Sequence, residues 1–145
     1  MLLSRPWQVI QRQGVRPAIT PESEPFWKAA KRGELTVERC PGCGLHLFPP
    51  HGICRRCLRR ELQWVRITAP GVLVSWTVNH NAWSSDVEAV YGVGLVEFPS
   101  HSNVRFVGFL DGFEDPPTIG ALVDYAFEDS DKGIPRLCFT PWGNS

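Results

Sequence analysis

Apolar and polar positions alternate through most of the second half of the chain, and this period of two predicts β-strands. Five such segments are rich in Val, Phe, Trp and Tyr and are separated by turn-forming residues: Val72–Trp83, Val90–Phe98, Val104–Leu110, Ala121–Phe127 and Arg136–Thr140. Glycines inside these segments, Gly92, Gly94 and Gly108, indicate bends or bulges. Five strands with a long first one favour an OB-type barrel, with a small β-sandwich as the alternative.

The first half predicts one short helix and three short strands. Thr20 or Ser23 can cap a helix that Gly33 can end. The apolar residues of this stretch share one face of that helix: Phe26, Ala29 and Ala30. Alternating segments predict strands over Leu35–Arg39, Leu45–Phe48 and Leu62–Ile67. The predicted fold class is therefore mainly β, with an N-terminal helix.

Four cysteines form the pattern with the clearest chemistry. Cys40-Pro-Gly-Cys43 is followed after ten residues by Cys54-Arg-Arg-Cys57. A two-residue gap lets both sulfurs of a pair reach one ion, and two such knuckles give the tetrahedral four-sulfur site of a zinc ribbon. Because four thiolates leave no open position for water, we expect a structural zinc whose binding energy contributes to folding. Iron in a rubredoxin-like site is the alternative that sulfur ligation leaves open.

Fine geometry of the knuckles depends on the residues between and after the cysteines. Gly42 and Gly44 are expected to adopt the positive φ angles that point backbone N–H groups at the sulfurs. The fifth cysteine, Cys138, lies on the last apolar strand and is expected to be a buried core residue.

These elements divide the chain into three parts: an extended N-terminal arm over 1–20, a helix with a zinc ribbon over 21–68, and an OB-fold over 69–145. The formal net charge of the 145 residues is zero, but the charge is unevenly distributed. Residues 28–66 hold nine Lys and Arg against three Asp and Glu, whereas residues 67–145 hold three against ten. An acidic barrel repels a polyanion, which disfavours nucleic acid as a partner.

Arginines surround the second cysteine pair: Arg55, Arg56, Arg59 and Arg60. They are candidates for contact with phosphates, including those of coenzyme A, and a solvated basic face is the alternative.

No apolar run approaches the roughly 18–20 residues that cross a bilayer, and the first residues lack a signal-peptide pattern. We therefore expect a cytoplasmic protein without membrane contact, where paired cysteines indicate metal rather than disulfides.

A catalytic constellation is not evident in the sequence. The histidines, His46, His51, His80 and His101, form no recognisable Ser/His/Asp or Cys/His pattern. His51 is expected to be exposed, and His80 is the one histidine worth testing. We therefore predict no catalytic residue and no enzyme activity of the chain by itself.

The order and spacing of several short motifs resemble the DUF35 family, whose members join a rubredoxin-like zinc ribbon to an OB-fold. The motifs are Pro-Phe-Trp (25–27), Arg-Gly-Glu-Leu (32–35), Arg-Cys-Pro-Gly-Cys-Gly (39–44), Phe-Pro-Pro (48–50), Trp-Val (64–65) and Gly-Val-Leu-Val-Ser-Trp-Thr-Val (71–78). The resemblance covers nearly all of residues 20–142. The family's metal cysteines correspond to Cys40, Cys43, Cys54 and Cys57. One departure is Leu58, which follows Cys57 where many ribbons have Gly.

What the resemblance implies is an accessory subunit of a thiolase-type complex that acts on acyl-CoA substrates. A thiolase-fold partner would supply the catalytic cysteine, in a hetero-oligomer in which a coenzyme A thioester would be shared between the subunits. The alternative function is a zinc-ribbon and OB-fold protein that binds nucleic acid.

Overall fold

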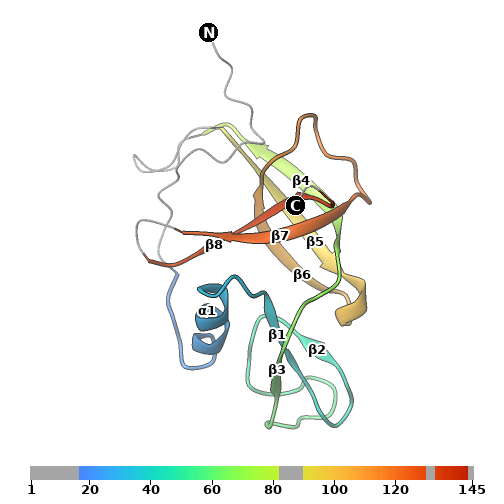
Figure 1. Ribbon diagram of the computed structural model, residues 1–145. Coiled ribbons are helices and arrows are strands. Elements are labelled where there is room, and N and C mark those ends of the chain that lie inside the picture. The colour runs from blue at the N-terminus through green and yellow to red at the C-terminus, as the bar shows by residue number, and fades with distance from the viewer. Residues whose placement is uncertain (1–16, 82–89, 130–132, 144–145) are drawn as a thin grey trace.

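The computed structural model describes residues 17–81, 90–129 and 133–143, which form one short α-helix, a small sheet and a barrel. Helix α1 (Glu24–Ala30) precedes a three-stranded antiparallel sheet of order β2-β1-β3. Its strands are β1 (Thr36–Arg39), β2 (His46–Leu47) and β3 (Gln63–Arg66). Figure 1 shows α1 and this sheet at one end of the barrel.

Five further strands close into a barrel of order β4-β5-β6-β8-β7. They are β4 (Gly71–Asn79), β5 (Tyr91–Phe98), β6 (Val104–Leu110), β7 (Leu122–Glu128) and β8 (Arg136–Pro141), with the 3₁₀ helix η1 (Pro99–His101) between β5 and β6. All barrel pairings are antiparallel except that of β6 with β8. The predicted mainly β fold with a five-stranded OB-type barrel is confirmed, and the sandwich alternative is wrong.

The glycines inside the strands make room for packing. In the described ladders the register shift falls between Leu73 and Ser75, not at a glycine. Gly94 pairs with Gly108 across β5 and β6. A Cβ atom at Gly108 would lie 2.9 Å from the carbonyl oxygen of Leu137 and 2.8 Å from the ring of Phe139. The described ladders thus have no bulge at the predicted glycines. Gly94 and Gly108 instead lack side chains where the barrel interior is crowded.

The helix is shorter than its sequence pattern, spanning seven residues. Its predicted apolar face is confirmed, since Phe26, Ala29 and Ala30 are all buried. Ser23 occupies the N-cap position without a side-chain cap, and its Oγ instead accepts a hydrogen bond from the Thr20 N–H at 2.9 Å. Thr20, the other predicted cap, accepts the Ser23 N–H with its Oγ1 at 3.3 Å in the turn before the helix. A helix this short also depends on the packing of its buried face.

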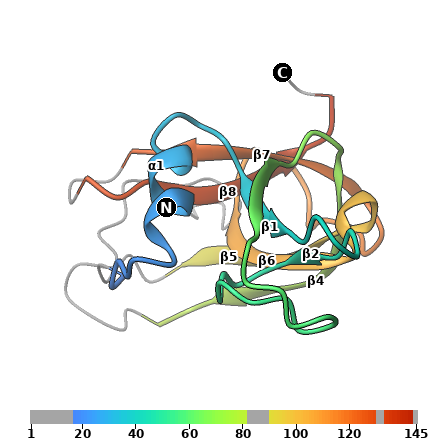
Figure 2. The same cartoon turned by 90° about the horizontal axis from the view of Figure 1, so that it is seen from below.

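Aromatic rings join the helix, the small sheet and the barrel in one core. The Phe26 ring on α1 lies 5.6 Å from that of Phe48, which follows β2, and 6.3 Å from that of Phe106 on β6. Phe26 also meets Phe127 on β7 at 6.4 Å. Figure 2, viewed from the end that carries α1 and the small sheet, shows these elements lying across the barrel. The zinc-ribbon part thus shares its hydrophobic core with the barrel.

Most of the expected N-terminal arm, residues 1–16, lies outside the described part of the chain, as does the end of the predicted strand Val72–Trp83. Among the described residues, no helix has the length and apolar character needed to span a membrane.

Candidate metal centre

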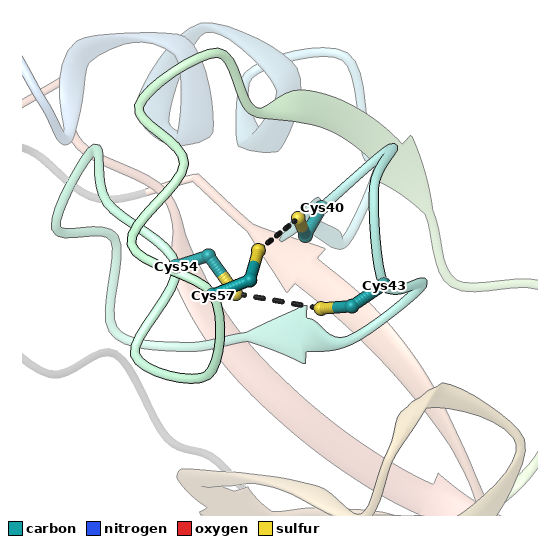
Figure 3. Close-up of side chains that lie close together, drawn as sticks. All are labelled: Cys40, Cys43, Cys54 and Cys57. Atoms are coloured by element: carbon teal, nitrogen blue, oxygen red, sulfur yellow. Dashed lines mark hydrogen bonds between the residues drawn. The ribbon is translucent and has the colours of Figure 1, made fainter.

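Two turns bring the four cysteine sulfurs together at the far end of the small sheet. Cys40 directly follows β1 and Cys43 comes next in the same turn, while Cys54 and Cys57 belong to the loop between β2 and β3. The sulfurs all lie within 4.8 Å of one another. Cys40 Sγ is 3.4 Å from Cys57 Sγ, and Cys43 Sγ is 3.6 Å from Cys54 Sγ (Figure 3). Each knuckle thus contributes one sulfur to each of these two pairs.

This arrangement fits a zinc ion. With Zn–S bonds of about 2.3 Å, the sulfurs of a regular tetrahedron lie about 3.8 Å apart. The sulfur positions therefore require only small shifts to bind a metal of that size. A separate small hydrophobic cluster, which includes Leu45 and Leu47, packs around Cys40 and Cys54.

The two knuckles share one backbone design. In the first, the Gly44 N–H donates to the Cys40 carbonyl at 2.8 Å, and in the second the Leu58 N–H donates to the Cys54 carbonyl at 2.8 Å. Gly44 has φ of 73° and Leu58 has φ of 62°. Leu58 therefore adopts the left-handed conformation that glycine adopts in the first knuckle, although its side chain makes this conformation costly.

Gly42 lies between the two cysteines of the first knuckle. It does not belong to the glycines of positive φ, so that part of the expectation is wrong, although its N–H does favour the Cys40 thiolate. Gly44 has the expected positive φ, but its N–H donates to the Cys40 carbonyl. A Cβ atom at Gly42 would lie 2.8 Å from Nε of Arg59. Gly42 thus makes room for Arg59 of the second knuckle to lie against the first knuckle. Its positive charge there is opposite in sign to the charge of the thiolates.

Backbone N–H groups favour the thiolate form of two cysteines. The N–H of Cys43, against a smaller effect of burial, lowers the pKa of Cys40 to about 6. The N–H of Cys57 is the main cause that lowers the pKa of Cys54. For Cys57 the N–H of Arg59 favours the thiolate, but the Cys40 sulfur, burial and the other two sulfurs together raise the pKa to about 11. Because a metal needs all four groups as thiolates, its binding displaces protons from this cluster.

Glu38 supports the second knuckle, a role that the strand pattern around it did not reveal. This residue of β1 is buried, and its Oε2 accepts hydrogen bonds from the N–H groups of His51 at 3.1 Å and Gly52 at 3.4 Å. It therefore fixes the loop that leads into Cys54. Glu38 occupies a polar position in the alternation of the predicted strand Leu35–Arg39, so the sequence pattern gave no signal of its burial.

The arginines of the second knuckle and two of the histidines have exposed side chains. The predicted arginines Arg55, Arg56, Arg59 and Arg60 are all exposed. His51 is exposed as predicted, and His80 is exposed just after β4. Cys138 is buried as predicted, and burial raises its pKa strongly.

The remaining two histidines meet where the small sheet touches the barrel. His46 on β2 and His101 on η1 have ring centroids 5.0 Å apart. Nδ1 of His46 lies 3.0 Å from Oγ of Ser102, which also accepts the His46 backbone N–H at 3.1 Å. Burial is the largest cause that lowers the pKa of both histidines. Sequence reasoning did not pair these residues because 55 positions separate His46 from His101.

Two family models match successive parts of the chain. Residues 27–63 match the ChsH2 rubredoxin-like zinc ribbon domain, and residues 64–128 match the ChsH2 C-terminal OB-fold domain. The chain is also 32% identical over 127 residues to a probable enoyl-CoA hydratase alpha subunit of Thermomonospora curvata. That match covers 87% of this chain, which spans 39% of the length of the curated relative.

Two solved structures are similar to the chain. The Ltp2-ChsH2(DUF35) aldolase contains a chain with a TM-score of 0.78 and 29% identity, and the match covers 87% of this chain and 98% of that one. A DUF35 protein of unknown function from Sulfolobus solfataricus has a TM-score of 0.59 at 18% identity, covers 83% and 85% of the two chains, and supports the fold alone. With a zinc ribbon followed by an OB-fold and four cysteines positioned to bind a metal, the chain belongs to the DUF35 family.

Proposed function

We propose that this protein is the zinc-ribbon subunit of a hetero-oligomeric enzyme that acts on acyl-CoA thioesters, and that a thiolase-fold partner carries out the reaction. The observation that carries the proposal is the likeness to a chain of the Ltp2-ChsH2(DUF35) aldolase over 98% of that chain. The name of the Thermomonospora curvata relative, an enoyl-CoA hydratase alpha subunit, supports acyl-CoA as the substrate class.

In this proposal the metal is a zinc ion held by Cys40, Cys43, Cys54 and Cys57. A zinc ion with four thiolate ligands has no position for a substrate or water, so its contribution is to hold two knuckles and their loop in one conformation. Residues 21–68 would form this rigid part and residues 69–145 the OB-fold. We propose that the complex works in the cytoplasm, where thiolates are retained as metal ligands.

The partner would supply the reacting groups. Of the sequence candidates for acid–base chemistry, His80 and His51 lie on exposed segments, and His46 is engaged with Ser102. The proposal therefore assigns assembly and shaping of the substrate site to this chain. The shared core between ribbon and barrel supports this role, because a single rigid body presents a fixed surface to a partner.

Co-expression tests the proposal. The tagged chain is produced together with the products of its neighbouring genes, and the complex is analysed by size-exclusion chromatography and by turnover of acyl-CoA substrates. We expect co-elution with a thiolase-fold protein and turnover only by the complex. Cys43→Ser should abolish co-elution, whereas the matched control Cys138→Ser should retain it. Acyl-CoA turnover by the chain alone, or elution separate from every candidate, would contradict the proposal.

A further inference from the structure

The knuckle tip, residues 54–61, presents an apolar side chain to solvent. Leu58 is 70% exposed, the largest fraction among the exposed large hydrophobic residues in the described part of the chain. It directly follows the metal ligand Cys57, and its N–H donates to the Cys54 carbonyl at 2.8 Å. Figure 1 shows the turns at this end of the small sheet pointing away from the barrel. The leucine therefore projects outward from a turn that the metal site holds in place.

The conformation of Leu58 is one that glycine adopts at the equivalent place in the first knuckle. Gly44 has φ of 73° and Leu58 has φ of 62°. A side chain makes this conformation costly, and packing does not offset the cost because the side chain of Leu58 is exposed. Strained residues concentrate at functional sites, where another requirement outweighs the strain. An exposed leucine at this place is therefore better explained by a contact with another molecule than by the fold.

Exposed arginines surround the leucine on both sides. They are Arg55, Arg56, Arg59 and Arg60. None of the four pairs with a carboxylate among the described residues, and Glu61 is the single acidic residue of the knuckle tip. Residues 28–66 hold nine Lys and Arg against three Asp and Glu, and the four thiolates with zinc would offset two of these six surplus charges. The knuckle tip thus combines an apolar centre with a basic rim.

This combination fits a protein surface better than a nucleic acid or a membrane. The stretch from 51 to 63 contains no Phe, Trp or Tyr on which a base could stack, and the acidic barrel repels a polyanion. A single leucine also offers little apolar area to a bilayer. Protein interfaces, in contrast, join an apolar core to a polar rim and are enriched in arginine.

We propose that the knuckle tip is a docking element for a protein surface that offers an apolar pocket to Leu58 and carboxylates to the surrounding arginines. The charge of the rim requires an acidic partner surface, and the rest of this chain shows the same kind of complementarity in its own basic and acidic parts. The identity of the partner as the catalytic subunit rests on the proposed function. The metal then supports assembly directly, because its ligands Cys54 and Cys57 hold the turn that presents Leu58.

Leu58→Gly separates docking from folding. The variant gives the second knuckle the residue type that the first knuckle has, so zinc content and Tm, measured on the same samples, should not fall. Biolayer interferometry with the immobilised zinc-loaded chain and the thiolase-fold subunit measures binding. We expect Leu58→Gly to raise the Kd at least about tenfold, mainly through faster dissociation. The matched control Leu122→Ala, at a barrel position that is 48% exposed, should leave the Kd unchanged.

Charge reversal tests the basic rim. Arg56→Glu and Arg60→Glu should each slow association with the subunit at least about threefold at low ionic strength, and added salt should shrink the difference. Lys31→Glu reverses an exposed cation at the end of α1 and is the matched control, which should associate like the unaltered chain. Equal slowing by all three reversals would show that net charge alone matters and would overturn docking through the knuckle tip.

Single-stranded DNA and vesicles with anionic lipid are the other ligands in the same assay, and we expect neither to bind. Binding of either that Leu58→Gly abolishes would overturn the inference, because the knuckle tip would then serve a different class of molecule. Unchanged binding of the thiolase-fold subunit by Leu58→Gly and by both arginine variants would overturn it as well.

The outcome is separable from that of the proposed function. A complex with a thiolase-fold protein that none of these variants weakens contradicts the docking element and leaves the proposed function standing. A complex that depends on Leu58 but whose partner does not act on acyl-CoA supports the docking element and contradicts the proposed function. Absence of any protein complex contradicts both.

Discussion

The Phe48 ring, which follows strand β2 of the ribbon, lies with its centroid 4.0 Å from that of Phe106 on barrel strand β6. Phe106 is 3% exposed and also meets Phe26 of the helix and Phe98 of β5. One barrel residue therefore contacts each of the three parts of the described chain. This contact predicts that ribbon and barrel unfold together.

Phe106→Ala should lower the free energy of unfolding by about 3–5 kcal/mol, because it removes a large buried side chain and leaves a cavity. Denaturant titration followed by both fluorescence and zinc release measures the change. The matched control Val107→Ala alters the next residue, which is 65% exposed, and should change stability by less than about 0.5 kcal/mol. Separate transitions for zinc release and barrel unfolding in the unaltered chain would contradict the shared core.

Leu58→Gly should stabilise the second knuckle. Leu58 has φ of 62° and a side chain that is 70% exposed, so it carries the cost of the left-handed conformation without burying its side chain. Glycine removes a cost of about 1–2 kcal/mol and adds an entropy cost of about 0.5–1 kcal/mol, for a net gain of roughly 0.5–1 kcal/mol. Thermal unfolding of the zinc-loaded chain checks this, and a lowered Tm would contradict the strain assigned to Leu58.

Glu38→Ala should loosen the loop that carries Cys54. The substitution removes the acceptor of two backbone N–H groups, and leaving such groups unpaired costs about 1–3 kcal/mol. We expect faster transfer of zinc to a chromogenic chelator and a lower Tm. Glu61→Ala, which alters an exposed glutamate beyond the second knuckle, is the control. Equal zinc-transfer rates for the two variants would show that Glu38 does not support the site.

Stability should fall as the pH drops below about 6.5, in part because of His46 and His101. Both have pKa values lowered from the usual 6.5, chiefly by burial, and for His46 also by His101 and Arg39. The unfolded chain thus binds protons more readily than the folded one. The stabilisation that the two neutral histidines contribute is therefore complete above about pH 6.5 and is lost as the pH falls through their lowered pKa values.

Comparison of matched variants isolates this effect from protonation of the cysteines. Across pH 5–8, His46→Asn should show a smaller loss of Tm than the unaltered chain, while His51→Asn, at an exposed position, should follow the unaltered profile. Identical profiles for all three proteins would contradict the role of His46.

The sequence pattern predicted the strands well because each strand has its own alternation of apolar and polar residues. Strand β6 begins and ends at the predicted Val104 and Leu110, and the buried face of α1 matches Phe26, Ala29 and Ala30. The cysteine spacing likewise predicted the four-sulfur cluster, since each pair is a local turn. In these cases neighbouring residues carry the whole signal.

Such local patterns could not predict contacts between residues that are far apart in the sequence. The meeting of His46 with Ser102 depends on how β2 lies against η1, and the place of Gly42 depends on Arg59 of the other knuckle. Lys28 of α1 and Arg66 of β3, which are 38 positions apart, line one pocket of about 390 Å³. Only the packed structure brings these residues together, because no local period relates them.

The most direct test of the account is the metal content of the purified chain, measured by inductively coupled plasma mass spectrometry beside Cys40→Ser, Cys43→Ser and Cys138→Ser. The account predicts one zinc per chain in the unaltered protein and in Cys138→Ser, and a loss of zinc together with a loss of the folded state in the two ligand variants. Iron in place of zinc, or a folded Cys43→Ser protein without metal, would contradict it.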